Sequence, residues 1–562
     1  MLKKGIYLIL LLAIIAAGVF IFMNFNSTKP NTDSNTKQEQ EIEAGGTDKV
    51  ETPEQLVSKI LSLSKEGKII DFPYQAGVSE IDEINEALGE PTITDESILG
   101  NYVTYSNDVT VGYQDNLSFD LRSYDKRLQQ IHLSNIKEVQ GEPTETKYYK
   151  DDTTDQIILI YQVNSTYQLK WILPNPTELN SDPVVHHISI YTKPPVSAEV
   201  LTLLKGMTLE EKIGQMIFAG VDGTTFDSHA LSLIHDYKVG GIIFNKKNFS
   251  SSEQTIQYLN KIRYENTSNK IPLFFGVDQE GGIVAKLPGN LTPIPTNLEI
   301  GKVNNIDFSN SIGQLLGKEV KAYGFNMNFA PVLDINSNPN NPVIGNRSFG
   351  NSADLVSRLG IATMKGIQSE NIIAVVKHFP GHGDTSTDSH LELPRVNKSL
   401  EELQQLELLP FQQAITEGAD VVMIAHILLP NIDSTNPSSM SKVVISDILR
   451  NQLQYDGVVI TDDMTMEAII DNFDIGDASV QSVKAGSDIV MVAHGFENAA
   501  DIFESLKTAV ENGELSEERI DESIIRILQL KEKYQLKDEQ IQSFNINTLN
   551  EQIKGVLNEY NG

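Results

Sequence analysis

Apolar residues recur along the second half of the chain in short runs, separated by stretches with helical periodicity. Runs that are almost entirely apolar are typical of strands covered on both faces, and the intervening helices supply that cover. Repeated strand–helix units of this kind predict an α/β fold, a closed (β/α)8 barrel of the TIM type. The eight runs are residues 216–220, 241–245, 272–278, 327–333, 372–378, 420–426, 457–462 and 488–494.

An open, doubly wound parallel sheet is the alternative fold for the same strand–helix rhythm. Such sheets usually bind nucleotides through a glycine-rich phosphate turn or a dinucleotide fingerprint, and the sequence contains neither. We therefore prefer the barrel for residues 196–540 and expect residues 541–562 to form a C-terminal tail.

Residues 50–195 have a different pattern, with a weak internal repeat. Gly-Glu-Pro-Thr occurs at residues 89–92 and again at 141–144, and aromatic and β-branched runs follow at 102–113 and 157–173. This pattern predicts a small α+β module built from two copies of one unit. It is similar to an uncharacterised module found in tandem on Bacillus-type exported proteins, and we assign it no role.

The N-terminus carries a candidate membrane segment. Lys3 and Lys4 precede residues 5–23, which contain no charge and are long enough to cross a bilayer as a helix. By the positive-inside rule, residue 1 lies in the cytoplasm and the remainder outside. A cleaved signal peptide is the alternative for residues 1–23, and both alternatives predict export. Residues 24–49 are polar and predict a linker.

Composition narrows the classes of function. The 562 residues include 76 acidic and 44 basic side chains, a net charge of −32, and no cysteine. The charge argues against a nucleic-acid partner, which needs clustered Lys and Arg. The absence of cysteine excludes disulfides, thiolate metal sites and a cysteine nucleophile. We expect a monomer that needs no cofactor and no metal.

Polar residues follow seven of the eight predicted strands. Active sites of (β/α)8 barrels lie where the strands end, so these positions predict one shared site. A single polar residue at a strand end is more often a cap or a loop anchor, whereas seven together favour chemistry. The residues are Asn245, Asp278, Gln279, Glu280, Asp334, Lys377, His378, His426, Asp462, Asp463 and His494.

Residues 377–390 form a loop that contains three histidines, two acids and a lysine. Within it, Asp388 is two residues before His390. A carboxylate that accepts the Nδ1 hydrogen bond fixes the imidazole tautomer and raises its basicity, as a general acid/base requires. A metal site is one alternative for this loop. A pair that merely pins the loop to the barrel is another.

Residues 457–464 predict a buried strand that delivers an acid at its carboxyl end. Asp462 is placed there to be a nucleophile or an electrostatic stabiliser. Asp463 is an alternative to Asp462, or a second acid that orients a neighbour.

The chain resembles glycoside hydrolase family 3, in its bacterial β-N-acetylglucosaminidase branch. The resemblance covers residues 200–540 and is carried by residues 276–282 (Gly-Val-Asp-Gln-Glu-Gly-Gly), 346–349 (Asn-Arg-Ser-Phe), 377–390 and 460–464 (Ile-Thr-Asp-Asp-Met). It implies a (β/α)8 barrel, with Asp462 as nucleophile and His390 as acid/base partnered by Asp388. It also implies that the substrate is bound by Asp278, Lys286, Arg347, Lys377 and His378.

One departure from the family pattern affects the substrate site. The family usually has two arginines after Asp-Gln-Glu-Gly-Gly, where this chain has Ile283 and Lys286. A lysine can hold a sugar hydroxyl as a point charge, but it lacks the planar, bidentate geometry of arginine.

The resemblance implies a retaining exo-β-N-acetylglucosaminidase that removes terminal N-acetylglucosamine from peptidoglycan fragments or muropeptides. The predicted anchor places this activity at the extracellular face of the cell membrane, or in the cell wall if the segment is cleaved. A β-glucosidase or β-xylosidase of the same family, and a wall-binding surface protein without catalysis, are the alternatives.

Overall fold

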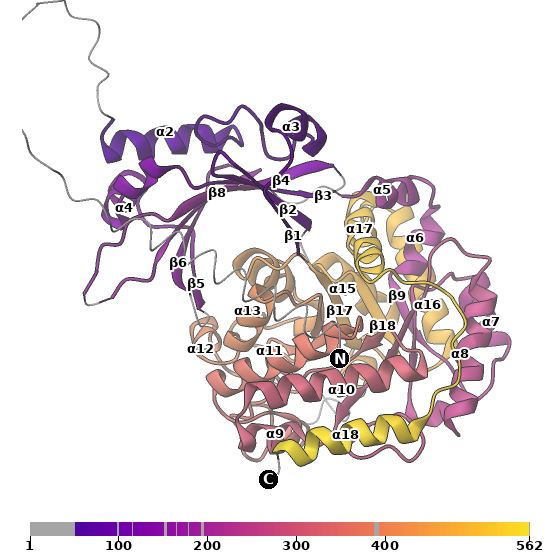
Figure 1. Ribbon diagram of the computed structural model, residues 1–562. Coiled ribbons are helices and arrows are strands. Elements are labelled where there is room, and N and C mark those ends of the chain that lie inside the picture. Colours follow the sequence, from indigo (N-terminus) through magenta and orange to yellow (C-terminus); the bar gives the residue numbers. More distant parts are fainter. Residues whose placement is uncertain are drawn as a thin grey trace, which may run out of the picture.

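The computed structural model describes residues 51–97, 100–114, 116–150, 154–164, 166–177, 179–192, 196–386 and 393–560. They form two parts with separate hydrophobic cores, a module that ends at Thr192 and a larger part that begins near Val196. Figure 1 shows the two parts and the order of their elements.

The first part is a mixed α+β module. Its sheet has the order β1-β2-β3-β4-β8-β7-β6-β5, and every neighbouring pair is antiparallel. The strands are β1 (Ile93–Ser97), β2 (Gly100–Tyr105), β3 (Val109–Gln114), β4 (Leu117–Ser123), β5 (Glu145–Lys150), β6 (Asp155–Gln162), β7 (Tyr167–Pro174) and β8 (His187–Thr192). The helices are α2 (Pro53–Lys65), α3 (Ile81–Leu88) and α4 (Leu133–Gln140), on one side of the sheet in Figure 1.

The sheet order has the symmetry that a duplicated unit requires. Helix α3 precedes β1 to β4, and helix α4 precedes β5 to β8. The two sets of four meet at the β4–β8 pair, so the second set runs in reverse order through the sheet. Each Gly-Glu-Pro-Thr segment lies between the helix and the first strand of its set. Trp171 and Leu121 are among the fully buried side chains between sheet and helices.

The second part is the predicted barrel. Its eight parallel strands pair in chain order, and β9 closes the ring by pairing with both β18 and β10. They are β9 (Ile217–Gly220), β10 (Gly241–Phe244), β11 (Phe274–Val277), β14 (Met327–Asn328), β15 (Ile373–Phe379), β16 (Val421–Ile424), β17 (Val458–Asp463) and β18 (Ile489–Val492). Six of the eight apolar runs contain one of these strands, and β15 and β17 each extend one residue beyond their runs, so the predicted barrel is confirmed.

One strand is much shorter than its apolar run. The sequence predicts a strand over residues 327–333, but β14 ends at Asn328. Pro331 follows and has no N–H to give to a ladder, so regular pairing stops. Val332 rejoins the sheet only through an isolated bridge to Lys377.

Helices surround the barrel and cover the outer faces of its strands (Figure 1). Their first turns are capped as the sequence dictates: Thr208 and Glu211 form a capping box on α6, and Asn305 caps α10. The helices are α5 (Ala198–Lys205), α6 (Leu209–Gln215), α7 (Ser228–His235), α8 (Ser252–Asn266), α9 (Asn297–Val303), α10 (Ile306–Tyr323), α11 (Ala353–Ser369), α12 (Leu400–Gln405), α13 (Leu409–Thr416), a π-helix (Val443–Gln452), α14 (Glu467–Ile470), α15 (Ile475–Ala485), α16 (Phe496–Glu511) and α17 (Glu517–Lys533).

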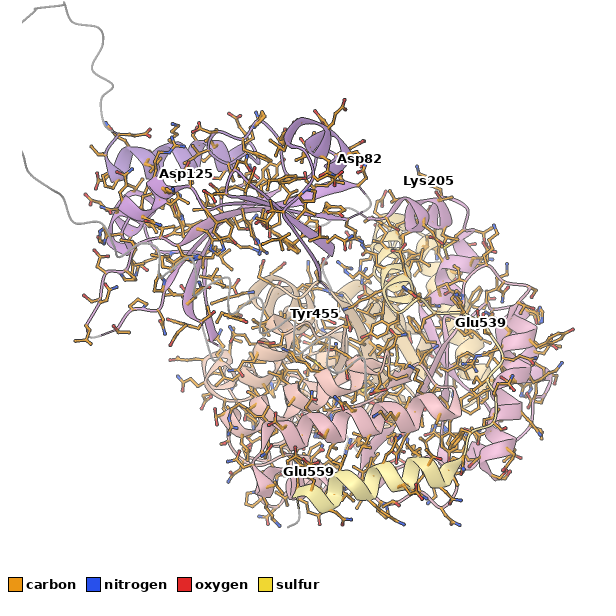
Figure 2. The ribbon with its side chains drawn as sticks, viewed as in Figure 1. Asp82, Asp125, Lys205, Tyr455, Glu539 and Glu559 are labelled. Atoms are coloured by element: carbon orange, nitrogen blue, oxygen red, sulfur yellow. The ribbon has the colours of Figure 1, made fainter. Side chains whose placement is uncertain are left out.

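The amino ends of the strands are closed by buried side chains. Lys531 of α17 donates from Nζ to Gln215 Oε1 at 2.7 Å and to the carbonyls of Gly240 at 2.9 Å and Pro272 at 2.7 Å. Burial lowers the pKa of this ammonium to about 7. Tyr455, labelled in Figure 2, lies just before β17, with its hydroxyl 2.9 Å from the Val458 carbonyl. These contacts fill the amino-terminal end of the barrel with buried, hydrogen-bonded side chains.

The C-terminal segment is a part of the barrel's outer layer. Residues that we expected to form a tail include α18 (Ile546–Tyr560), which lies along α10 in Figure 1 and carries Glu559, labelled in Figure 2. Ile553 is fully buried, and Asn550 Oδ1 accepts from the backbone N–H of Thr292 at 2.6 Å.

Among the described residues, none of the helices has the length and apolar character needed to span a membrane. The predicted anchor (residues 1–23) and the predicted linker (residues 24–49) lie outside the described residues, and both stay predictions.

Candidate active site

A pocket of about 470 Å³ opens at the carboxyl ends of the barrel strands. Strands β10, β15, β16, β17 and β18 contribute residues to its wall, and Asp278, which directly follows β11, lies there too. The predicted residues Asp278, Lys286, Arg347, Lys377, His378 and Asp462 all line it. The structure therefore brings together side chains that are far apart in the sequence, as the barrel prediction requires.

Asp278 lies between two ammonium groups. Its Oδ1 accepts from Lys377 Nζ and its Oδ2 from Lys286 Nζ, both at 2.7 Å. Lys286 also donates to Asn245 Oδ1 at 2.9 Å. Burial alone would raise the pKa of Asp278, but the two lysines lower it well below its usual range. The acid is ionised at neutral pH and can accept hydrogen bonds from sugar hydroxyls.

Glu280 shares Lys377 with Asp278 and binds Arg347 as well. The Arg347 guanidinium binds this carboxylate in a bidentate manner. Its Nε donates to Oε2 at 2.9 Å and its Nη2 donates to Oε1 at 2.8 Å. Lys377 Nζ lies 2.7 Å from Oε1 of the same carboxylate. Despite nearly complete burial, these cations lower the pKa of Glu280 to about 2. A bidentate charge pair of this kind leaves Arg347 little freedom.

His378 is held by a buried acid, Asp334. Its Nδ1 lies 2.6 Å from Asp334 Oδ2, and the backbone N–H of His382 donates to Oδ1 at 2.6 Å. Burial would raise the pKa of Asp334, but His378 and His382 lower it. An ionised carboxylate only accepts, so His378 carries a hydrogen on Nδ1. Nε2 then faces Arg347 Nη2 at 3.4 Å, inside the pocket.

Asp462, at the end of β17, is a pocket acid that no described ion pair holds. Of the described residues, only the backbone N–H of Asp463 donates to its carboxylate, at 2.9 Å. Burial would raise the pKa of Asp462, but His378, His426 and the N–H of Asp463 together lower it. The side chain is thus an ionised, partly buried carboxylate on the pocket wall.

The carboxylate of Asp463, by contrast, makes hydrogen bonds that stabilise the fold. Its Oδ1 accepts from the backbone N–H groups of Thr465 at 3.0 Å and Ala493 at 2.8 Å. Its carbonyl lies 3.0 Å from Nε2 of the buried His426. These contacts tie the end of β17 to β18, and they favour Asp462 over Asp463 as the reacting acid.

The predicted pair Asp388 and His390 lies outside the described residues, which stop at Ser386 and resume at Leu393. The described start of the same loop lies at the pocket. His382 lines the pocket wall, and its Nδ1 is 2.8 Å from Thr385 Oγ1. Burial, followed by the effect of His378, lowers the pKa of His382 to about 4, so this imidazole is neutral at pH 7.

Two residues have roles that sequence reasoning left unassigned. Glu280 and Asp334 both appeared in the pattern of polar strand ends, and Glu280 also lies in the family motif at residues 276–282. Their partners Arg347 and His378 come from other loops and strands, so the pairings need the folded structure.

The described residues hold no group of three or more His, Asp or Glu side chains arranged to bind a metal ion. A larger hollow of about 1020 Å³ lies between α15 and α16. It includes Asp474, Asp477, Asp501 and Glu504 but no residue from a strand end. The pocket at the strand ends is therefore the candidate active site.

Comparison with known protein families agrees with the choice of the strand-end pocket as the candidate active site. Residues 208–530 match the model of the glycosyl hydrolase family 3 N terminal domain, and residues 57–191 match a domain of unknown function, DUF4309. The first match spans more than half of the chain and contains every pocket residue named above.

Named relatives and solved structures point the same way. The chain is 36% identical over 335 residues to beta-hexosaminidase A of Pseudoalteromonas piscicida, a match that covers 55% of this chain and 56% of that protein. It is 31% identical over 322 residues to the beta-hexosaminidase of Nitrosomonas eutropha, covering 56% of this chain and 91% of that protein.

A similar solved structure is the family 3 beta-N-acetylglucosaminidase of Paenibacillus sp. str. FPU-7. It is 40% identical, with a TM-score of 0.59, and the match covers 62% of this chain and 68% of that one. The strand-end pocket, the matched residues and these relatives agree, and the chain belongs to glycoside hydrolase family 3.

Proposed function

We propose that the protein is a retaining exo-β-N-acetylglucosaminidase. The observation that carries this proposal is the arrangement around Asp462, an ionised carboxylate with one described donor. It lies in a pocket where Asp278 and Glu280 are already paired with Lys286, Arg347 and Lys377. Relatives named beta-hexosaminidase support the choice of sugar.

In the first step, the Asp462 carboxylate attacks the anomeric carbon and the bond to the leaving-group oxygen breaks. His390, protonated, gives its proton to that oxygen. The products of this step are a covalent glycosyl-aspartate and the released alcohol. The lowered pKa of Asp462 keeps the nucleophile ionised at neutral pH.

In the second step, neutral His390 takes a proton from water, and the resulting hydroxide attacks the same anomeric carbon. The bond to Asp462 breaks, which restores the carboxylate, and two inversions leave the configuration retained. Asp388 accepts the Nδ1 hydrogen bond of His390 in both steps and favours the protonated imidazole.

The remaining pocket residues hold the sugar. Asp278 accepts from hydroxyls, whereas Lys377, Arg347 and Lys286 donate to them, and the carboxylates Asp278 and Glu280 fix these cations before substrate arrives. Prearranged donors lower the cost of ordering in the transition state. Lys286 supplies a single ammonium where the family pattern has an arginine, so this contact is less directional.

We further propose that the substrates are peptidoglycan fragments that end in N-acetylglucosamine, and that the enzyme is tethered outside the cell by residues 1–23. The uncharged segment after Lys3 and Lys4 and the polar residues 24–49 support a tether. An enzyme at this place meets cell-wall glycans.

The test compares chromogenic β-N-acetylglucosaminide with the matching β-glucoside and β-xyloside. We expect release of the aglycone from the first, with little from the others. Faster turnover of the glucoside or xyloside would make the protein a glucosidase or xylosidase of the same family. No release above background would favour a wall-binding protein without catalysis. NMR of the first-formed sugar anomer decides between retention and inversion.

A further inference from the structure

Gln279 is a buried residue next to the pocket whose side chain has no contact with the pocket itself. It follows Asp278 directly, and it is 3% exposed. Its carbonyl accepts from Asn328 Nδ2 at 2.9 Å, and its N–H donates to Asn328 Oδ1 at 3.0 Å. Neighbouring β14 thus holds the backbone immediately after Asp278 from both sides.

The side-chain amide of Gln279 spans the hairpin of β12 (Gln279–Gly281) and β13 (Val284–Ala285). Its Oε1 accepts from the backbone N–H of Lys286 at 2.9 Å and of Leu287 at 3.3 Å. The same amide therefore fixes the start of the segment that carries Lys286. Asp278 and Lys286, which face each other at 2.7 Å, are both tied to one glutamine.

Glu319, in the last third of α10, determines which way that amide points. Its Oε2 accepts from Gln279 Nε2 at 2.8 Å, and Glu319 is 1% exposed. Oε2 accepts this bond, as either oxygen of an ionised carboxylate or the carbonyl oxygen of a protonated carboxyl can, so the NH₂ side of the amide faces Glu319 and its oxygen faces Lys286. Without this acceptor, a turned amide would place its NH₂ against the N–H of Lys286, and two hydrogen bonds would be lost.

We infer that Glu319 is a positioning residue of the active site, which acts through Gln279 to fix the distance between Asp278 and Lys286. It touches neither the pocket nor the substrate. The inference rests on the proposed function in one respect, because the substrate that Asp278 and Lys286 hold is taken to be the sugar.

The kinetic test uses the full chain with Glu319→Leu, and Glu319→Gln as the conservative variant. Leu removes the acceptor, whereas Gln can accept from Gln279 with its own Oε1. We expect KM for the chromogenic substrate to rise about tenfold in Glu319→Leu and to return to within about twofold of wild type in Glu319→Gln. A merely structural role would lower the folded fraction, and with it kcat, but would leave KM unchanged.

Ser309→Ala is the matched control. Ser309 is buried on the same helix and bonds to the Leu359 carbonyl at 2.8 Å, on the side of α11. It should lower the melting temperature without any change in KM. If Glu319→Leu behaves in the same way, the inference is overturned. If Glu319→Leu does not fold, Gln279→Met, which leaves Glu319 in place, must raise KM, and an unchanged KM would overturn the inference equally.

A second readout is independent of turnover. Crystal structures of wild type and Glu319→Leu measure the separation of Lys286 Nζ and Asp278 Oδ2. We expect the ion pair to separate in the variant, and an intact pair would overturn the inference. An inactive wild type would contradict the proposed function, and the crystal structures would still test the positioning role.

Discussion

The carboxylate of Asp334 and the imidazole of His378 form a buried pair, with Oδ2 and Nδ1 2.6 Å apart. Asp334 is fully buried and follows β14, whereas His378 is near the end of the neighbouring strand β15. The acid also accepts from the N–H of His382, so one carboxylate organises the start of the loop that leads toward His390. The pair connects the pocket wall at His378 to the described start of the loop that contains His390.

We predict that Asp334→Asn lowers kcat/KM by roughly 10-fold to 100-fold, because the imidazole loses the charge that orients it. If Asp334 acts through His378, the double variant Asp334→Asn/His378→Ala should have the same kcat/KM as His378→Ala alone. This result corresponds to a coupling free energy of about 1–3 kcal/mol between the two residues. Steady-state kinetics on the four proteins measure this. If the losses in kcat/KM of the two single variants multiply in the double variant, Asp334 does not act through His378.

For the nucleophile, we predict that Asp462→Asn lowers kcat by roughly 10³-fold or more, since no glycosyl-aspartate can form. A fluorinated mechanism-based sugar should add its mass to wild type and leave Asp462→Asn unmodified, as read by intact-mass spectrometry. Asp463→Asn is the matched control. It should unfold at a lower temperature, because Asp463 ties β17 to β18, yet still become labelled. Labelling lost in Asp463→Asn and kept in Asp462→Asn would reverse the roles.

The sequence was sufficient to predict the barrel because a strand covered on both faces leaves a plain signal, an apolar run between helices. The end of each run then placed Asp278, Lys377, His378 and Asp462 at one end of the barrel, where the structure brings them together. Strand length was less predictable. The run over residues 327–333 looked like its neighbours, yet Pro331 cannot take part in a ladder and β14 is short.

Pairings across the barrel could not be predicted from the sequence. Glu280 and Arg347 are joined only when two loops meet above the strands, and nothing in their local sequence indicates the partner. The packing of α18 could not be predicted either, because its apolar face is recognisable as buried only once α10 lies against it. The roles of Asp388 and His390 stay predictions, as do the anchor and the linker, because these residues lie outside the described part.

The stability of the barrel should depend on the ionisation of Glu319. Burial raises the pKa of Glu319 from 4.5 to about 7, although the bond from Gln279 opposes the rise. The folded state then holds a proton that the unfolded chain has lost, so this contribution to stability is full below about pH 4.5 and is lost as the pH rises to about 7. The shift corresponds to about 3 kcal/mol at most.

Glu319→Gln isolates this effect because it keeps the acceptor and removes the charge. We expect its free energy of unfolding, from urea denaturation, to equal that of wild type near pH 4.5 and to exceed it by up to about 3 kcal/mol at pH 8. A difference between the two proteins that does not change with pH would show that Glu319 does not titrate in this range.

The last prediction concerns Asp388 and His390 and rests on proton transfer. If His390 is the acid/base, His390→Ala should slow substrates with poor leaving groups by roughly 10²-fold to 10⁴-fold, and aryl glycosides with good leaving groups much less in the first step, because an activated phenolate departs without a proton. The glycosyl-enzyme should then accumulate, and azide should restore turnover by attacking without base assistance.

Asp388→Asn should show a milder form of the same pattern, since the imidazole remains but its partner is lost. Rates for a series of aryl glycosides, with and without azide, measure these effects. The alternative, that the pair only pins the loop, predicts a lower melting temperature and equal losses for all leaving groups, and that result would remove His390 from the mechanism.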